Sequence, residues 1–389
     1  MCRGASFQVA DNLAETRDIS TLRIPDDLKP RDGRFGSGPS KTRNASLEAL
    51  IKSSTSYLGT SHRQSTVKSQ VGRVRQGLKE LFGLDDGYEI VLGNGGSTAF
   101  WEIAVCGLIE RRSQHLVFGE FSSKFAQSAK ACPHIEDPQI IESPVGAHPF
   151  AVAADDIDVY ALTHNETSTG VSMEIARPDG ATGLVVVDAT SAAGGLRFRP
   201  SECDVYYFAP QKCFGGDGGL WLSAMSPAAI ERANKLCKDS RRWVPAFLDL
   251  SIAIENSLVD QTYNTPSLTT ILMLAEQVDW MNQNGGMSFS SGRCDRSAEI
   301  LYTWAQSSKY ATQFVSDPAM RSHVVGTIDF DDSIDASQIA KVLRSNGIVD
   351  TEPYRKLGRN QLRIAMFPNI DSEDIALLTQ AIDWVAERL

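Results

Sequence analysis

Four polar groups in this sequence stand directly after apolar runs, and their types could do chemistry. Lys212 follows the run DVYYFAPQ, and Asp188 ends the run LVVV. The segment GGST (residues 95–98) follows YEIVLGN, and NET (residues 165–167) follows DVYALTH. A desolvated lysine can act as a nucleophile, a carboxylate can pair with a cation, and a glycine-rich helix start can bind an anion.

Each group also has an ordinary structural interpretation. Ser97 or Thr98 would serve as the N-cap of the helix that follows the GGST segment. Asp188 would cap or turn the chain just past its strand. Lys212 would extend its amine into solvent at a strand end, which is the usual role of a single lysine at such a place. Taken one at a time, the residues leave both interpretations open.

The combination favours one cofactor. Pyridoxal phosphate needs an anion site for its phosphate, a carboxylate for its protonated ring nitrogen and a lysine for the Schiff base with its aldehyde. The small glycines after Lys212 leave room for the ring and for close approach of the chain. The three needs match residues 95–98, Asp188 and Lys212, so the sequence predicts a pyridoxal phosphate site.

The elements that must position these groups are parallel strands covered by helices. Continuous Val, Leu and Ile runs alternate with stretches of helical spacing, which is typical of strands buried on both faces. In such sheets, ligands bind beyond the carboxyl ends of the strands. We therefore predict an N-terminal arm (1–32), a large, mostly parallel α/β domain (33–270) and a small C-terminal α+β domain (271–389). In the small domain we expect residues 323–330 to pair with residues 362–368.

Composition excludes several classes of function. The 389 residues carry a formal net charge of -10, which argues against a protein built to bind nucleic acid in bulk. There is no apolar stretch of membrane-spanning length and no secretory h-region near the start, so we expect a cytoplasmic protein without a membrane partner. Seven scattered cysteines without a C-x-x-C pair argue against disulfides or a metal site.

Motifs along most of the chain carry a resemblance to a known family. They are, in order, GSGPSKTR, GTSHR, GNGGSTAFWE, HNETSTG, VVVDATSAAGG, YYFAPQK, DQTYNTPS and GIVDTEPYRKLGRNQLRIAMFP. Each is weakly specific, but their order and spacing are highly specific. The chain resembles the phosphoserine aminotransferases, which are class V, fold-type-I pyridoxal phosphate enzymes, and in detail their actinobacterial-type branch.

The resemblance implies roles for the residues around the cofactor. Lys212 would form the Schiff base and carry the proton between Cα and the cofactor, and Asp188 would pair with the ring nitrogen. Phe121 falls where the family often has a tryptophan stacked on the ring. The remaining implied contacts are to the phosphate (Gly96, Ser97, Gln211), to the ring hydroxyl region (Thr167) and to the phosphate of a neighbouring subunit's cofactor (Asn264, Thr265).

The resemblance also implies the substrates. Arg363 would bind the α-carboxylate, Arg63 the distal carboxylate or phosphate, and Arg355 the phosphate, because arginine forks suit both groups. Relatives often carry His-Arg where this chain reads Tyr354-Arg355. A surface ion pair remains the alternative for any one of these arginines. Further helpers are His62, Arg43, Arg241 and Arg242.

The implied function is reversible transamination between O-phospho-L-serine and 2-oxoglutarate, giving 3-phosphohydroxypyruvate and L-glutamate. This reaction belongs to L-serine biosynthesis, and a related pyridoxine-pathway substrate, 4-phosphohydroxy-L-threonine, could be accepted. A homodimer with shared active sites is implied as well.

Three alternatives stay open. One is an alanine-glyoxylate or serine-glyoxylate aminotransferase, and another is a cysteine desulfurase, for which Cys294 is the only remotely placed sulfur acceptor. The third is a non-catalytic protein that kept the fold, against which Lys212 and Asp188 argue.

Overall fold

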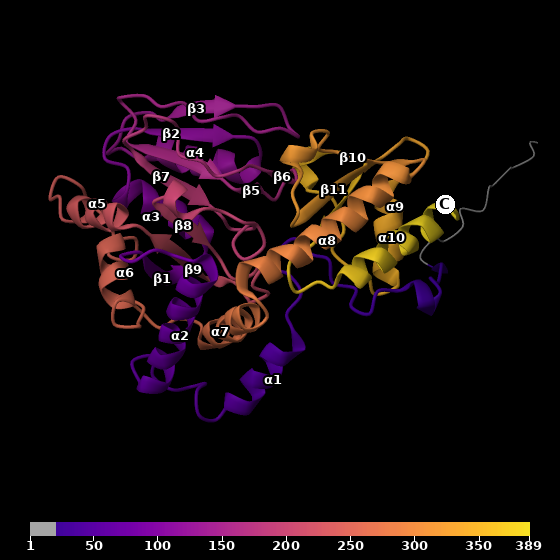
Figure 1. Cartoon of the computed structure of the whole chain (residues 1–389), viewed down its shortest axis with the longest axis horizontal. Helices are drawn as coiled ribbons and strands as arrows, with labels where there is room; N and C mark the ends of the chain where they lie inside the picture. The colour runs from indigo at the N-terminus through magenta and orange to yellow at the C-terminus, as the bar shows by residue number, and fades with distance from the viewer. Residues whose placement is uncertain (1–20) are drawn as a thin grey trace, which may run out of the picture.

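A seven-stranded sheet forms the centre of the larger part of the molecule (Figure 1). The computed structural model describes residues 21–389. The strand order is β1-β9-β8-β7-β4-β2-β3, and only β9 runs antiparallel to its neighbours. The strands are β1 (Glu89–Gly95), β2 (Ser113–Val117), β3 (Gln139–Glu142), β4 (Val159–Thr163), β7 (Leu184–Asp188), β8 (Val205–Phe208) and β9 (Gly219–Met225). The predicted, mostly parallel sheet is thus confirmed.

Helices cover both faces of this sheet, which explains its continuous apolar runs. Val185 and Tyr206 point to one face, where α2 (Ser65–Phe82) and α7 (Leu268–Gln283) pack. Val186 and Tyr207 point to the other face. That face is covered by α3 (Ser97–Gly107), α4 (Glu120–Ala131), α5 (Pro227–Cys237) and α6 (Leu250–Ser257).

The smaller part is built on a three-stranded antiparallel sheet, β10-β11-β12. Its elements are β10 (Ala311–Gln313), β11 (Val325–Phe330), β12 (Gln361–Ala365), α8 (Gly286–Ser307), α9 (Ala336–Ser345) and α10 (Ser372–Ala386). The pairing of β11 with β12 confirms the predicted contact between residues 323–330 and 362–368, with Val325 opposite Ala365.

The described chain from residue 21 to Phe35, ahead of α1 (Asn44–Ser53), packs on this smaller part. Ile24 is buried in its core, and the Ile24 N–H donates to Asn346 Oδ1 at 3.0 Å. The Phe35 N–H donates to the Val349 carbonyl at 3.2 Å. Residues 1–20 of the predicted arm lie outside the described residues.

The helix α7 connects the two parts. Its buried residues, including Ile271 and Val278, belong to the core under the large sheet. It ends just before Gly285 and Gly286, as the Gly-Gly stop in the sequence indicates. The boundary at residue 270 stays a prediction, and the packing of α7 favours a division between α7 and α8.

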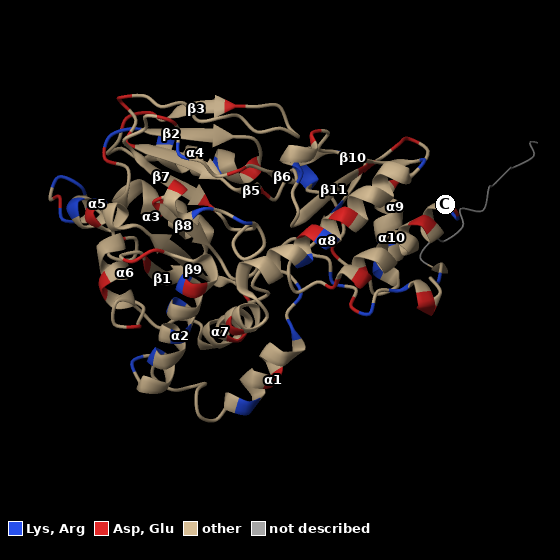
Figure 2. Cartoon of the chain, viewed as in Figure 1, with Lys and Arg blue, Asp and Glu red and all other residues tan. Residues whose placement is uncertain are grey.

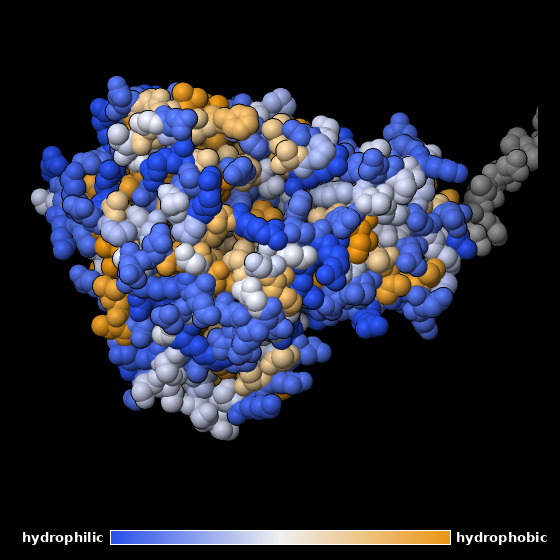
Figure 3. All heavy atoms as spheres, viewed as in Figure 1, coloured by the Kyte–Doolittle hydropathy of each residue, from blue (hydrophilic) through white to orange (hydrophobic). Residues whose placement is uncertain are grey.

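Short elements complete the described chain. They are the hairpin of β5 (Asn165–Glu166) and β6 (Val171–Ser172) and the 3₁₀ turns η2 (Asp26–Leu28), η3 (Pro200–Glu202), η4 (Pro318–Met320) and η5 (Arg355–Leu357). Lys and Arg are intermixed with Asp and Glu over helices and loops (Figure 2). The face drawn in Figure 3 is mostly hydrophilic, with apolar atoms in scattered groups. Within residues 21–389, no helix is both long and apolar enough to cross a membrane.

Candidate active site

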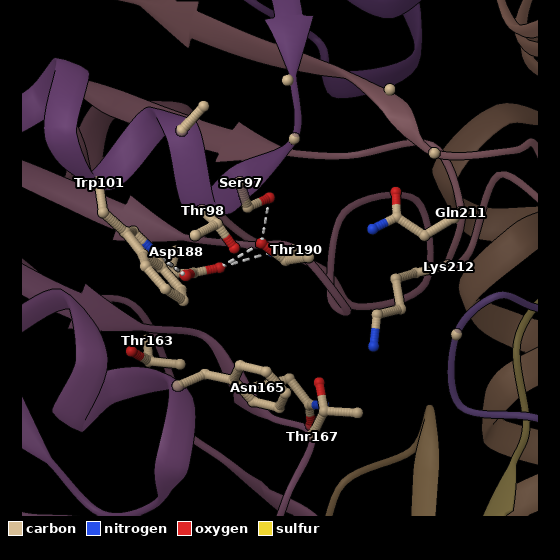
Figure 4. Close-up of a pocket in the computed structure, with 17 residues that line it drawn as sticks. Ser97, Thr98, Trp101, Thr163, Asn165, Thr167, Asp188, Thr190, Gln211 and Lys212 are labelled. Atoms are coloured by element: carbon tan, nitrogen blue, oxygen red, sulfur yellow. Dashed lines mark hydrogen bonds between the residues drawn. The ribbon is translucent and has the colours of Figure 1, made fainter.

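A cavity of about 520 Å³ lies at the carboxyl ends of the parallel strands (Figure 4). The turns after β1, β4, β7 and β8 all reach it, as the rule for parallel sheets requires. Of the residues predicted to bind a cofactor, seven line it: Gly96, Ser97, Phe121, Thr167, Asp188, Gln211 and Lys212. The wall also includes Gly38, Thr98, Trp101, Thr163, Asn165 and Thr190.

Lys212 is buried at the cavity wall, and its amine points into the open space in Figure 4. The Nζ donates a hydrogen bond to the Ser37 carbonyl. Burial, followed by the nearby charge of Arg363, lowers the pKa of the Lys212 amine from 10.5 to about 8. A large share of the amine is therefore neutral near pH 8, which is the form that attacks an aldehyde.

Asp188 faces Lys212 from the other side of the cavity (Figure 4). Its Oδ2 accepts hydrogen bonds from Trp101 Nε1 and from the Tyr207 hydroxyl, both at 3.0 Å. Its Oδ1 accepts from the Thr190 N–H at 2.9 Å and from the Thr190 hydroxyl at 2.5 Å. No Lys, Arg or His in residues 21–389 forms an ion pair with this carboxylate. The charge is thus oriented by neutral donors and stays available to a cationic ligand.

Trp101, Thr190 and Tyr207 were not predicted from the sequence. Trp101 lies one helical turn after Ser97 on α3, and Tyr207 lies opposite Asp188 in the β7–β8 register. In the sequence, Trp101 and Tyr207 both look like core residues in an apolar run. The polar atoms of buried Tyr and Trp side chains need partners, and a carboxylate at the end of the adjacent strand supplies one.

The anion end of the cavity is the start of α3. Gly96 is the N-cap with a φ of 142°, and no heavy atom lies within 4 Å of the position of a Cβ there. The Ser97 hydroxyl lies 2.7 Å from the Thr190 hydroxyl, which joins this end to Asp188. Nearby, Gln211 Oε1 is buried without a partner among the described residues.

Thr167 and Phe121 form two further walls of the cavity. The Thr167 hydroxyl donates to Ser191 Oγ at 2.8 Å, and Asn165 Nδ2 donates to the same oxygen at 2.8 Å. The ring centre of Phe121 lies 5.8 Å from Lys212 Nζ. This places an aromatic ring beside the amine, and the stacking of Phe121 on a cofactor ring stays a prediction.

Arg363 reaches this wall from β12. Its Nη1 donates to the Thr167 carbonyl at 3.2 Å, while its Nε is buried with no partner in the described chain. Its Cζ lies 5.5 Å from the ring centre of Tyr354, whose ring is in turn 6.1 Å from that of Phe121. Burial lowers the pKa of the Arg363 guanidinium from its ordinary value. Arg363 is partly buried and is not among the residues that line the cavity. A partly buried cation with an unused donor and no carboxylate partner suits an anionic ligand.

The structure does not bring the other predicted residues to this cavity. Arg355 is exposed on η5. Arg63 and His62 contact the loop that carries Asn264 and Thr265: Arg63 Nη1 donates to Gln261 Oε1 at 2.6 Å, and His62 Nδ1 lies 3.2 Å from Thr265 Oγ1. These assignments stay predictions.

The other three proposed helpers, Arg43, Arg241 and Arg242, also lie elsewhere. The Arg43 guanidinium packs on Trp280, with 4.1 Å between Cζ and the ring centre. Arg241 pairs with Asp239, and Arg242 donates to backbone carbonyls, including that of Ile109 at 2.8 Å. None of the three lines the cavity of its own chain.

The cavity fits pyridoxal phosphate by the chemistry of its wall. It offers a helix start with a glycine N-cap for a phosphate, a carboxylate for a ring nitrogen and a buried amine for an aldehyde. The unpartnered polar atoms of Gln211 and Asn165 line the same space. No group of His, Cys, Asp or Glu within residues 21–389 is arranged to hold a metal ion.

The fold and this site define a fold-type-I aminotransferase architecture. The family model for aminotransferase class V matches residues 34–351, so the chain belongs to that family. The chain is 58% identical over 371 residues to the phosphoserine aminotransferase of Nocardioides sp., covering 95% of this chain and 99% of the relative. A putative phosphoserine aminotransferase of Mycolicibacterium vanbaalenii is 57% identical over 369 residues, covering 95% of this chain and 99% of the relative.

Solved structures agree with this assignment. The phosphoserine aminotransferase of Cytophaga hutchinsonii superposes with a TM-score of 0.84 at 25% identity, covering 91% of this chain and 99% of that chain. The alanine-glyoxylate aminotransferase of Nostoc sp. reaches 0.75 at 20% identity, covering 97% and 100%, which shows the shared fold alone.

The cysteine named for the desulfurase alternative is not placed to accept sulfur. Cys294 is fully buried within α8 and does not line the cavity. Burial also raises the pKa of its thiol, which keeps the thiol protonated.

Proposed function

We propose that the cavity catalyses reversible amino transfer between O-phospho-L-serine and 2-oxoglutarate, yielding 3-phosphohydroxypyruvate and L-glutamate. The observation that carries this proposal is the placement of buried Lys212 across the cavity from Asp188, a carboxylate that no side-chain cation of the described chain pairs with. Relatives named for this activity match nearly the whole chain.

Bound pyridoxal phosphate supplies an aldehyde that takes up the amino group and a ring that withdraws electrons from the substrate Cα. The protein's part is to orient groups and move protons. Lys212 Nζ transfers the proton to and from the substrate Cα, because its lowered pKa suits both directions near neutral pH. Asp188, oriented by Trp101 and Tyr207, holds the ring nitrogen in its protonated form.

The arginines divide the substrate between them. Arg363 binds the α-carboxylate, because its partly buried guanidinium has a free donor, Nε, beside the wall formed by Thr167. Arg355 is exposed, and no side chain of the described residues makes a hydrogen bond or ion pair with it. We assign it to the substrate phosphate, which needs a free cation at the rim.

We further propose a homodimer with shared sites. Arg63, His62, Asn264 and Thr265 lie together on the surface, joined by the His62–Thr265 contact and the bond from Asn94 Nδ2 to Asn264 Oδ1 at 2.8 Å. None lines this chain's own cavity. The adjoining residues Leu258, Val259 and Tyr263 are exposed, as expected of a surface that a second subunit covers. In a dimer the cluster would serve the partner's cofactor and substrate.

Two further assignments are part of the proposal. The use of a pyridoxine-pathway substrate, 4-phosphohydroxy-L-threonine, follows from the same phosphate and carboxylate requirements. A cytoplasmic location follows from the substrates of L-serine synthesis.

A substrate panel tests the reaction. Purified protein with pyridoxal phosphate and 2-oxoglutarate is assayed for glutamate with phosphoserine, serine and alanine as donors. Phosphoserine should give the highest kcat/KM by a wide margin. Equal turnover of serine or alanine would contradict the phosphate assignment and favour the glyoxylate-type alternative. Mixing a Lys212→Ala subunit with an Arg63→Ala subunit should restore one working site per dimer, and an inactive mixture would contradict site sharing.

A further inference from the structure

Glu166 is a fully buried carboxylate that the proposed reaction does not use. No Lys, Arg or His in the described part of the chain forms an ion pair with it. It instead accepts hydrogen bonds from neutral donors on two segments: Ser122 N (2.9 Å), Phe121 N (3.1 Å), Ser122 Oγ (3.0 Å), Ser168 Oγ (2.7 Å) and Ser168 N (3.2 Å). Burying a charge without a counterion is expensive, so this set of donors has to be held in place.

The carboxylate anchors the first turn of α4. The first N–H groups of a helix have no partner within it, and negative charge is favoured at that end. Glu166 accepts from the N–H groups of Phe121 and Ser122, while Ser168 Oγ accepts from the Glu120 N–H at 3.0 Å. The first three N–H groups of α4 are thus all bound by the turn that starts at Glu166.

The start of α4 and the turn at residues 166–168 approach so closely that no space is left between them. A Cβ added at Gly119 would lie 2.3 Å from Glu166 Cγ and 2.4 Å from its Cδ. Such distances are far below van der Waals contact. A glycine is therefore required where α4 begins, and the position of the helix relative to Glu166 is fixed.

Two walls of the cofactor cavity extend from this junction. Phe121, on the α4 side, places its ring 5.8 Å from Lys212 Nζ. Thr167, on the other side, lines the cavity and accepts the Arg363 hydrogen bond at its carbonyl. The distance between the aromatic face and the Thr167 wall is set by the bonds of Glu166 to both segments.

We propose that Glu166 is a positioning residue, which holds the Phe121 and Thr167 walls at the spacing that the cofactor ring requires. This inference rests on the proposed function only in taking the cavity as the cofactor site. Loss of the carboxylate should let the first turn of α4 move away from the 165–168 turn and weaken cofactor binding.

The test is the affinity of the apoenzyme for pyridoxal phosphate, measured by tryptophan fluorescence and by absorbance. In Glu166→Gln, an NH₂ that cannot accept replaces one of the two carboxylate oxygens, so either the N–H groups of α4 or the N–H of Ser168 face a second donor. We expect affinity to fall about tenfold or more, which is typical of a lost bond to a buried charged acceptor. The control is Asp158→Asn, at the opposite end of β4, where a partly buried carboxylate accepts from Glu110 N, Arg111 N and Arg112 N at 2.7 to 2.8 Å and also pairs with Arg232 at 3.2 Å. It should lose stability and keep its affinity.

A double variant shows whether the effect passes through the aromatic wall. Because Glu166 acts on Phe121, combining Glu166→Gln with Phe121→Ala should cost less affinity than the product of the two single losses. Should Glu166→Gln fail to fold, Ser168→Ala removes one donor to the same carboxylate and should give a smaller loss.

Three results would overturn the inference: wild-type affinity in Glu166→Gln, equal losses in Glu166→Gln and Asp158→Asn, or wild-type affinity in Ser168→Ala. Failure of the wild-type apoenzyme to bind pyridoxal phosphate would instead refute the proposed function.

Discussion

Gly38 gives the reactive lysine its room, and replacing it by alanine should disable the site without unfolding the protein. A Cβ at Gly38 would lie 2.5 Å from Lys212 Cε, 2.6 Å from its Cδ and 2.7 Å from its Nζ. Ordinary carbon contacts are about 3.5–4.0 Å, so the end of the lysine would have to move by about 1 Å. A misplacement of that size can cost roughly a hundredfold in rate.

The backbone cost of the change can be separated from its effect on the lysine. Gly38 has a φ of 123°, and Gly285 has a φ of 118°, where a Cβ would meet only Phe289 Cβ at an ordinary 3.5 Å. Alanine at such a φ costs roughly 1–3 kcal/mol. Gly285→Ala is therefore the matched control for stability.

The assay is the kcat of glutamate formation from phosphoserine, with melting temperatures of both variants. We expect similar melting temperatures, a kcat reduced about a hundredfold in Gly38→Ala and a kcat near that of the wild type in Gly285→Ala. Wild-type kcat in Gly38→Ala, or equal loss of kcat in both variants, would refute the reasoning.

Three further predictions concern the charged groups. Arg363→Ala should raise KM for both phosphoserine and glutamate, because both carry an α-carboxylate, whereas Arg355→Ala should raise it mainly for phosphoserine; the same pattern in both variants would contradict the division. Tyr354→Leu removes the aromatic ring beside the Arg363 guanidinium and should raise KM a few-fold, which is the size of a lost cation–π contact. Tyr354→Phe keeps the ring and should leave KM unchanged, so equal KM values in the two variants would contradict a role of the ring. Between pH 8 and 10.5 the unfolded chain binds more protons at Lys212 than the folded chain does. The free energy of unfolding of the apoenzyme should therefore rise with pH, by roughly 3 kcal/mol over this window relative to Lys212→Met. Denaturant unfolding that shows no such relative rise would contradict the lowered pKa of Lys212.

The cavity residues at the strand ends could be predicted because two simple rules coincide. Runs such as LVVV mark strands buried on both faces, and a polar residue that ends such a run must lie at the sheet edge. Asp188 and Lys212 were found in this way. Their meeting in one cavity follows from the parallel direction of β7 and β8.

The residues that hold Asp188 in place could not be found by these rules. Tyr207 lies in an apolar run, and its contact depends on the register between β7 and β8. Likewise, β9 runs antiparallel between β1 and β8, and its direction leaves no trace in its apolar pattern. The sequence shows Glu166 only as part of a polar strand end. Its five hydrogen-bond donors could not be predicted, because they come from two segments, residues 121–122 and Ser168, that only the fold brings together around the carboxylate.

The attachment point of the cofactor is the most direct test of the account. The enzyme as purified with pyridoxal phosphate is reduced with borohydride, which fixes the cofactor to the amine that it is bonded to, and the peptides are examined by mass spectrometry. We expect a pyridoxyl group on Lys212 alone. A label on another lysine, or an unlabelled protein that still transaminates phosphoserine, would contradict this assignment.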